Sequence, residues 1–314
     1  MSLPQTCVVT GGAGFIGSTL VRVLLSRGFR VKVIDNLLTG HEKNLDEVRC
    51  CIEFHPADIR RYDAIRPIIE GADTVFHLAA IPSVPRSIDD PVPSHEVNID
   101  GTFNVFQAAK TGGVRRVVYA ASSSAYGDTA VLPKVETMRP EPLSPYALQK
   151  LVGEYYASVF TSCFGLETVC LRFFNVYGPR QDPNSPYSGV LSLFLKHLIN
   201  RTVPLIHGDG EQTRDFTYVE DVAELVVKAA HAPNASGRVY NAGNGGRISL
   251  NQVWALLQEM EGVTIVPKYG APRAGDVRDS MADTVRAKAD LGHAPRFTIE
   301  EGLKRTLEWY RHAA

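Results

Sequence analysis

The sequence predicts an α/β protein with a doubly wound parallel sheet and a smaller C-terminal α/β region. Short runs rich in β-branched residues recur through the first half of the chain, and the segments between them are long enough for crossover helices. These runs are apolar on both faces, as strands covered by helices on both sides must be. The predicted strands are residues 7–10, 30–35, 74–78, 116–120 and 167–172, with one more strand ahead of Asp58.

The regular alternation weakens in the second half of the chain. After Asn175, prolines and glycines divide the sequence into shorter pieces, and no Gly/Ser-rich or charged linker marks a boundary. A chain of 314 residues is long enough for one large domain or two ordinary ones. We therefore expect residues 1–175 to form one region and residues 176–314 a second region packed closely on the first.

The composition excludes several classes of function. Lys and Arg number 33 against 34 Asp and Glu, so the net charge of −1 provides no broad positive field for non-specific nucleic-acid binding. The sequence shows no apolar run as long as a membrane span and no signal peptide, so we expect a cytoplasmic protein with a small-molecule partner. The five cysteines are odd in number and include no C-x-x-C, which argues against a disulfide framework, and no metal site is expected.

A glycine-rich loop follows the first predicted strand and opens a predicted helix at residues 15–27. Gly11 allows a tight turn, Gly14 lets the backbone approach a pyrophosphate at the positive end of the helix, and Gly17 permits close packing of helix on strand. Asp35 ends the second strand, where a carboxylate would accept hydrogen bonds from an adenosine ribose and repel a 2′-phosphate. The pattern predicts a Rossmann-type site for NAD rather than NADP.

Further contacts along the dinucleotide are expected from residues beside the glycines, after the strands and at the head of a helix. These are Phe15, Ile16, Asn36, Asp58, Ile59, Leu78, Ala79, Ala80 and Asn98. His77 stands among apolar residues of a strand, so we interpret it as a packed core histidine and not as a proton carrier.

Tyr146 and Lys150 are four residues apart on a predicted helix with Ser144 as its N-cap, so they share one face. A free tyrosine titrates near pH 10. A lysine ammonium and a nicotinamide cation nearby would both favour the phenolate, so the pair fits a base beside the cofactor. Residues 122–124 are three serines after the fifth strand, at the edge of a parallel sheet where ligands gather, and one of them could hydrogen-bond the substrate hydroxyl that loses its proton.

Over residues 10–291 the chain resembles the extended short-chain dehydrogenases/reductases of the nucleotide-sugar epimerase/dehydratase family. The likeness is greatest to UDP-hexose 4-epimerases, particularly those that accept N-acetylhexosamines, through segments 35–37, 83–87, 172–178 and 208–215. The resemblance implies Ser122 and Tyr146 as catalytic residues, with Lys150 as electrostatic partner and ribose ligand. It implies diphosphate contacts from Asn175, Arg214 and Arg273, a ribose contact from Asp276, uridine contacts from Val190, Lys196 and Ile206, and sugar contacts from Ser83, Arg86, Ser122, Ser123, Tyr146 and Ser280.

The resemblance also separates the reaction types of the family. Its dehydratases carry an Asp-Glu pair after the catalytic threonine and its decarboxylases carry a glutamate in the same stretch, whereas this chain has Ser123 and Ser124. Epimerisation needs one base: Tyr146 would take the C4 hydroxyl proton while NAD+ takes the C4 hydride, and the 4-keto sugar would turn over and be reduced on its other face. Ser280 stands where a bulky tyrosine excludes an N-acetyl group in UDP-galactose 4-epimerases. We therefore expect interconversion of UDP-GlcNAc and UDP-GalNAc, together with UDP-Glc and UDP-Gal.

The sequence also allows other functions. A UDP-glucuronate 4-epimerase shares most of these motifs, and Arg86, Ser83 or Thr129 could bind the extra carboxylate. A reductase that releases its nicotinamide and a non-catalytic NAD-sensing protein are the remaining alternatives; the latter generally lack the tyrosine or the lysine. Helices 98–110 and 145–164 correspond to those that form a dimer interface in the family, so the resemblance implies a homodimer.

Overall fold

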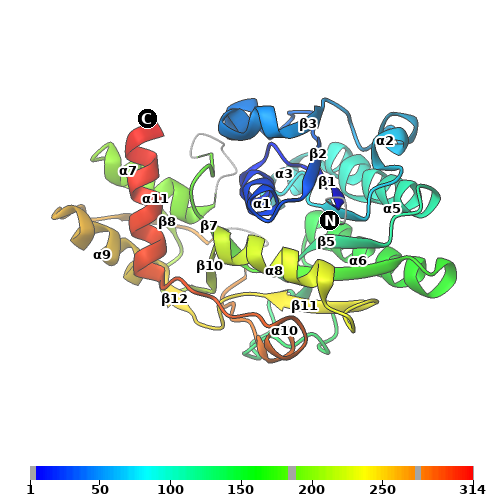
Figure 1. Cartoon of the computed structure of the whole chain (residues 1–314). Helices are drawn as coiled ribbons and strands as arrows, with labels where there is room; N and C mark the ends of the chain where they lie inside the picture. The colour runs from blue at the N-terminus through cyan, green and yellow to red at the C-terminus, as the bar shows by residue number, and fades with distance from the viewer. Residues whose placement is uncertain (1–4, 183–188, 273–276, 314) are drawn as a thin grey trace.

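The computed structural model describes residues 5–182, 189–272 and 277–313, and a seven-stranded parallel sheet forms its centre (Figure 1). The strand order is β11-β6-β5-β4-β1-β2-β3, and neighbouring strands run parallel throughout. This is the predicted α/β sheet of the Rossmann type. The strands are β1 (Thr6–Thr10), β2 (Arg30–Ile34), β3 (Ile52–His55), β4 (Thr74–His77), β5 (Arg116–Ser122), β6 (Glu167–Phe173) and β11 (Arg238–Ala242).

Helices cover both faces of this sheet, as the apolar character of the strands requires. One face packs against α1 (Phe15–Ser26), α8 (Val219–His231) and α10 (Val285–Leu291), whose buried side chains form a single apolar cluster with the strands. The other face packs against α2 (Tyr62–Ile69), α5 (Thr102–Thr111) and α6 (Pro145–Phe164). Between β4 and α5 the chain forms α3 (Val84–Asp89), α4 (Pro91–His95) and the π-helical turn η2 (Glu96–Gly101), and short 3-10 segments occur at η1 (Glu42–Cys51) and η3 (Ser123–Tyr126).

A third apolar cluster lies beside the sheet, where α7 (Val190–Ile199), α9 (Leu250–Glu261) and α11 (Ile299–Ala313) gather at one end of the molecule (Figure 1). Three two-stranded sheets accompany them. Their strands are β7 (Asn175–Tyr177) with β10 (Phe216–Tyr218), β9 (Thr213–Arg214) with β12 (Ile248–Ser249), and β8 (Leu205–His207) with β13 (Lys268–Gly270). This is the predicted smaller C-terminal α/β region.

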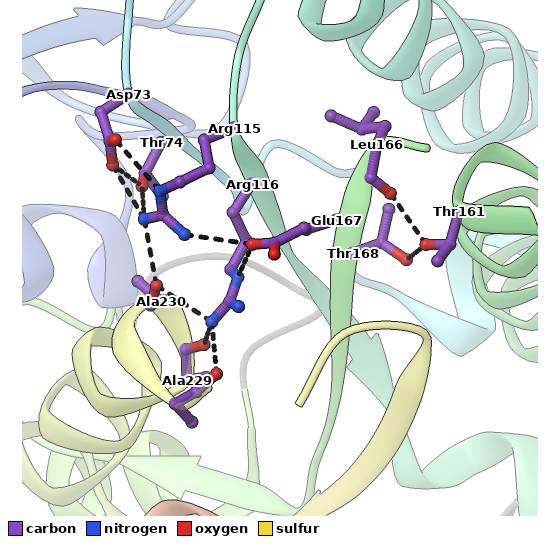
Figure 2. A network of polar contacts seen from close by, with 11 residues as sticks. Asp73, Thr74, Arg115, Arg116, Thr161, Leu166, Glu167, Thr168, Ala229 and Ala230 are labelled. Carbon is purple, nitrogen blue, oxygen red and sulfur yellow. Dashed lines mark hydrogen bonds and ion pairs between the residues drawn. The ribbon is translucent and has the colours of Figure 1, made fainter. Parts of the chain in front are cut away.

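Arg116 at the start of β5 fixes the end of α8 against the sheet (Figure 2). Its Nη1 donates to the backbone oxygens of Ala229, Ala230 and Ala232 at 3.0, 3.1 and 2.8 Å, and its Nε donates to Glu167 at 2.8 Å. The last carbonyls of a helix have no partner within the helix and carry its negative partial charge. One buried guanidinium therefore satisfies three of them and neutralises that end of α8.

The predicted strands of the first half are confirmed to within two residues at each end. The predicted helix at 15–27 is α1, and the helix behind Ser144 is α6, whose N-cap oxygen accepts from the amide of Ala147 at 3.2 Å. The sequence predicts a less regular alternation of strands and helices after Asn175. It does not predict β11, which returns to the main sheet and pairs with β6. Within the described ranges, no helix is long and apolar enough to cross a membrane, and no group of three or more potential metal ligands comes together.

Candidate functional site

A cavity of about 770 Å³ opens at the carboxyl edge of the sheet. Its lining includes Gly11 after β1, Asp35 after β2, Leu78 after β4 and Ser122 at the end of β5. Residues from the C-terminal part, among them Arg214, complete the wall. The cavity therefore lies where parallel sheets of this kind bind their ligands.

The glycine loop forms a cradle that side chains would fill. Gly11 has a φ of 73°, and a Cβ built there would lie 2.7 Å from the backbone nitrogen of Ala79. A Cβ on Gly17 would overlap the carbonyl oxygen of Gly11. Gly14 is the N-cap of α1 and has no side chain, so the first amides of the helix are left for a ligand in the cavity. These residues fit a dinucleotide diphosphate.

Asp35 is held rigidly at the end of β2. Its carboxylate accepts from the amides of Ala13 at 2.9 Å and Leu37 at 2.8 Å. Burial raises its pKa, and these two hydrogen bonds act in the opposite direction. The carboxylate lines the cavity, as recognition of a ribose would require.

Most of the predicted cofactor residues line the same cavity: Gly11, Gly14, Phe15, Ile16, Gly17, Asp35, Asn36, Ile59, Leu78, Ala79, Ala80, Tyr146 and Lys150. Asp58 and Asn98 do not. Asp58 is paired with Arg60 at 2.8 Å, and this interaction lowers its pKa to about 2. The buried amide of Asn98 holds both backbone polar groups of Ile81, which itself lines the cavity. Asn98 thus shapes the wall through Ile81.

Ser122 and Tyr146 both line the cavity, and their side chains are hydrogen-bonded to each other. The hydroxyl of Ser122 shares a hydrogen bond of 2.8 Å with that of Ser124, and its oxygen accepts from the amide of Ser124. The amide of Tyr146 donates to Ser87 at 3.1 Å, which fixes the first turn of α6. Burial raises the pKa of Tyr146, while its hydrogen bond with Ser122 lowers that pKa. In this environment Tyr146 is protonated near neutral pH, so a further positive charge in the cavity is needed to favour the phenolate.

Lys150 lies one turn further along α6 and is buried. Its Nζ lies 4.6 Å from the centre of the Tyr119 ring, and burial lowers its pKa to about 7. The carboxylate of Glu154, another turn along, opposes that shift. Glu154 in turn receives both arms of the Arg172 guanidinium at 2.9 and 2.8 Å. The charge of Lys150 therefore depends on a buried ion pair behind it.

His77 is confirmed as a packed core residue. It is fully buried and hydrogen-bonded to the hydroxyls of Thr10 at 2.7 Å and Thr102 at 3.0 Å. Burial lowers its pKa to about 3, so the ring is neutral at ordinary pH.

The predicted substrate residues divide into three groups. Those that line the cavity are Ser83, Arg86, Ser122, Ser123, Tyr146, Asn175, Arg214 and Ser280. Those that the structure places outside its lining are Val190 and Lys196 on α7 and Ile206, whose side chain is buried in the third apolar cluster. Arg273 and Asp276 lie outside the described residues.

Two residues that sequence reasoning did not select organise the C-terminal wall. The buried carboxylate of Asp215 accepts from the amides of Asn244 at 2.7 Å, Gly245 at 2.9 Å and Ala282 at 3.0 Å. It thereby holds the segment that carries Ser280. Its position in the 208–215 segment is the sequence feature that could have identified it as a functional residue. Lys134 also lines the cavity although it is buried.

Comparison with known proteins agrees with this geometry. Residues 7–243 match the family model described as the NAD dependent epimerase/dehydratase family. A UDP-glucose 4-epimerase of Mycolicibacterium smegmatis is 38% identical over 97% of this chain and 98% of its own. The solved UDP-N-acetylglucosamine 4-epimerase of Methanobrevibacter ruminantium, in complex with UDP-N-acetylmuramic acid, superposes with a TM-score of 0.94 at 35% identity and covers 99% of both chains.

A third relative carries both a cofactor and a substrate. The UDP-glucuronic acid 4-epimerase of Bacillus cereus, solved with UDP-glucuronic acid and NAD, superposes with a TM-score of 0.92 at 30% identity, covering 99% of this chain and 100% of its own. The matched family model spans most of the chain, including the glycine loop, Ser122, Tyr146 and Lys150. The chain therefore belongs to the NAD-dependent epimerase/dehydratase family.

Proposed function

We propose that the protein interconverts UDP-GlcNAc and UDP-GalNAc by inversion at C4, and that it also interconverts UDP-Glc and UDP-Gal. The relatives that act as UDP-glucose and UDP-N-acetylglucosamine 4-epimerases support a UDP-hexose substrate. The observation that carries the N-acetyl preference is the small side chain of Ser280 in the cavity wall. Its hydroxyl is buried and has no hydrogen-bond partner among the described residues.

The proposed chemistry uses the groups at the end of β5 and the start of α6. Bound NAD supplies the hydride acceptor and later the hydride donor at C4. Tyr146 takes the proton of the C4 hydroxyl and Ser122 hydrogen-bonds the same oxygen, while Lys150 favours the tyrosine phenolate and holds the nicotinamide ribose. After the 4-keto sugar has turned over, Tyr146 returns the proton to the C4 oxygen on the new face.

The absence of an acid in the serine stretch supports epimerisation over loss of water. Ser123 and Ser124 follow Ser122 in the cavity wall, and a hydroxyl group is too weak an acid to protonate a leaving hydroxide near neutral pH. We propose that Asn175 and Arg214 hold the diphosphate, because both line the same cavity. A guanidinium suits a diphosphate through paired hydrogen bonds.

A UDP-glucuronate 4-epimerase is the second candidate, and Arg86 is the observation that favours it. Its side chain lines the cavity and makes no ion pair with the described residues, so it could receive a sugar carboxylate. Ser83 caps α3 by accepting from the amide of Arg86 at 3.1 Å, and its O–H remains able to donate to the same carboxylate.

We further propose that two copies pair through α5 and α6. Apolar side chains are exposed along these helices: Phe103, Leu148, Tyr155, Val159 and Phe164. A second copy would cover this face. We also propose that residues 1–175 chiefly hold NAD and residues 176–314 chiefly hold the UDP-sugar, although α8 and β11 of the second segment lie in the layers of the main sheet.

Product analysis tests the substrate. Purified protein is incubated separately with UDP-GlcNAc, UDP-Glc and UDP-glucuronate, with and without added NAD, and the 4-epimers are resolved by NMR. We expect UDP-GalNAc from UDP-GlcNAc. Conversion of UDP-Glc alone would contradict the N-acetyl assignment, and conversion of UDP-glucuronate alone would establish the UDP-glucuronate alternative.

A matched pair of variants tests the base. Tyr146→Phe should abolish conversion while the protein stays folded, and Tyr269→Phe, the same change at an exposed position outside the cavity lining, should leave conversion unchanged. Retained activity in Tyr146→Phe would show that another group is the base.

A further inference from the structure

Lys134 is a buried cation in the wall of the cavity. Only 2% of its surface is exposed, and it lines the cavity together with Ser123, Ser124, Gly127 and Ser280. Lysine is almost never this buried unless its charge is paired. Among the described residues, no carboxylate lies within ion-pair distance of its ammonium, and Asp128 and Asp279 act on it only at longer range.

The ammonium group of Lys134 has more N–H donors than acceptors among the described residues. An ammonium group carries three N–H donors, and Lys134 uses one of them on the backbone oxygen of Thr129. Leaving the other donors of a buried charge without acceptors is costly. Because Lys134 lines the cavity, a ligand bound there is the group that could supply those acceptors.

The backbone of Lys134 is anchored beside the residue that we assign to the sugar. Its amide donates to the oxygen of Met281 at 2.7 Å, and its own oxygen accepts from Asp283 at 2.9 Å and from the side chain of Asn241 at 2.7 Å. Lys134 and Ala282 form a bridge between the two segments. Because Ser280 lies two residues from that bridge, the backbone of Lys134 is fixed close to the residue that we propose contacts the sugar.

We propose that Lys134 is a specificity residue for the hexose, with its ammonium donating to an oxygen on the sugar ring or on a ring substituent. This inference rests on the proposed function, since it assumes that the cavity holds a UDP-hexose. A positive donor suits a hydroxyl or acetamido oxygen and suits the carboxylate of a uronate more strongly. Lys134 makes no contact with the reacting C4 group in this assignment, so it recognises substrate and is not part of the proton transfer.

Calorimetric binding to NAD-loaded protein tests the proposal. The ligands are UDP, UDP-Glc, UDP-GlcNAc and UDP-glucuronate, and the variants are Lys134→Met, Lys134→Gln and the control Lys304→Met, which removes an exposed lysine from α11. For Lys134→Met we expect each hexose ligand to bind about 10-fold more weakly or worse, as for a lost charge-assisted hydrogen bond, while UDP binds as to wild type. Lys134→Gln, which keeps a neutral donor, should recover part of the loss, and Lys304→Met should bind all four ligands normally.

The pattern of losses identifies the acceptor. A loss greatest for UDP-GlcNAc assigns the acetamido oxygen, one greatest for UDP-glucuronate assigns the C6 carboxylate, and equal losses assign a hydroxyl shared by all three sugars. Unchanged hexose binding by Lys134→Met, or an equal loss of UDP affinity, would overturn the proposal. Since binding is measured without turnover, a failure of the wild-type protein to epimerise UDP-GlcNAc would contradict the proposed function separately.

Discussion

Behind the proposed catalytic lysine, Glu154 and Arg172 form a buried ion pair. Removing one of the two side chains should destabilise the folded protein, whereas removing both should not. Both side chains are about 4% exposed, and two hydrogen bonds join them. The Arg172 guanidinium also lies 4.5 Å from the centre of the Tyr126 ring, and its Nη1 has no partner among the described residues. The arginine is therefore already incompletely satisfied, and removing Glu154 would leave its charge buried with no counterion.

The size of the effect follows from this burial. Removing one partner of a buried ion pair costs about 3–5 kcal/mol, whereas replacing both partners by apolar side chains of similar volume is often neutral. For a chain of this length, a loss of that size lowers Tm by about 5 °C or more. We expect this drop for Glu154→Leu and expect the double variant Glu154→Leu/Arg172→Met to unfold within about 2 °C of wild type.

The two variants should share a change in the pH profile. The Glu154 carboxylate raises the pKa of Lys150, so its loss moves that pKa below about 7 in the single and the double variant alike. If activity requires the Lys150 ammonium, the alkaline fall of turnover then occurs at lower pH in both.

Thermal unfolding and turnover against pH measure the two effects separately. A wild-type unfolding temperature for Glu154→Leu would contradict this role of the ion pair, and so would a double variant that is as unstable as the single one. A recovered Tm together with a still-shifted pH profile would show that the pair's electrostatic and structural roles are distinct.

Three shorter predictions concern other residues. Ser280→Tyr should lower turnover of UDP-GlcNAc by about 100-fold while UDP-Glc stays a substrate, as steric exclusion of one substituent requires; equal losses for both sugars in a steady-state assay would contradict this. Burial lowers the pKa of His77 to about 3, so on acidification this residue takes up a proton in the unfolded chain but not in the folded protein. The free energy of unfolding of the wild-type protein should therefore fall by about 2 kcal/mol between about pH 7.5 and pH 5 because of this residue. Urea unfolding of His77→Gln should lack that part of the pH dependence, and an unchanged slope would count against it. Tyr155→Glu and Val159→Glu should each shift the proposed dimer to monomer in sedimentation velocity, whereas a wild-type protein that sediments as a monomer would exclude the dimer.

Strands β1, β4 and β5 could be predicted because they are buried along almost their whole length and consist mostly of apolar residues. β11 could not, because its sequence, Arg-Val-Tyr-Asn-Ala, carries polar groups that only distant partners satisfy. Asn241 accepts from the hydroxyl of Tyr126 at 2.6 Å and donates to the backbone oxygen of Lys134 at 2.7 Å. Tertiary contacts and not local pattern place this strand in the sheet.

The same distinction applies to the site. The glycine loop and the Tyr146–Lys150 spacing are local, so the sequence displays them directly. Lys134 is brought to the cavity by a bridge to Ala282, and Asp215 acts through amides that follow it by 29 to 67 positions. Contacts between residues so far apart in the sequence produce no periodic pattern of apolar residues. In the sequence alone, Lys134 and Asp215 therefore cannot be told from charged residues on the surface.

The position of β11 also has a consequence for the order in which the protein is made. β6 is complete once Phe173 has been synthesised, but the strand that pairs with its outer edge ends at Ala242. Until that later segment leaves the ribosome, one side of β6 presents unpaired backbone groups, the kind of edge that recruits foreign strands and promotes aggregation. Synthesis slowed between these two strands should therefore increase the demand for chaperones, and a chain cut short in that interval should be found in the insoluble fraction.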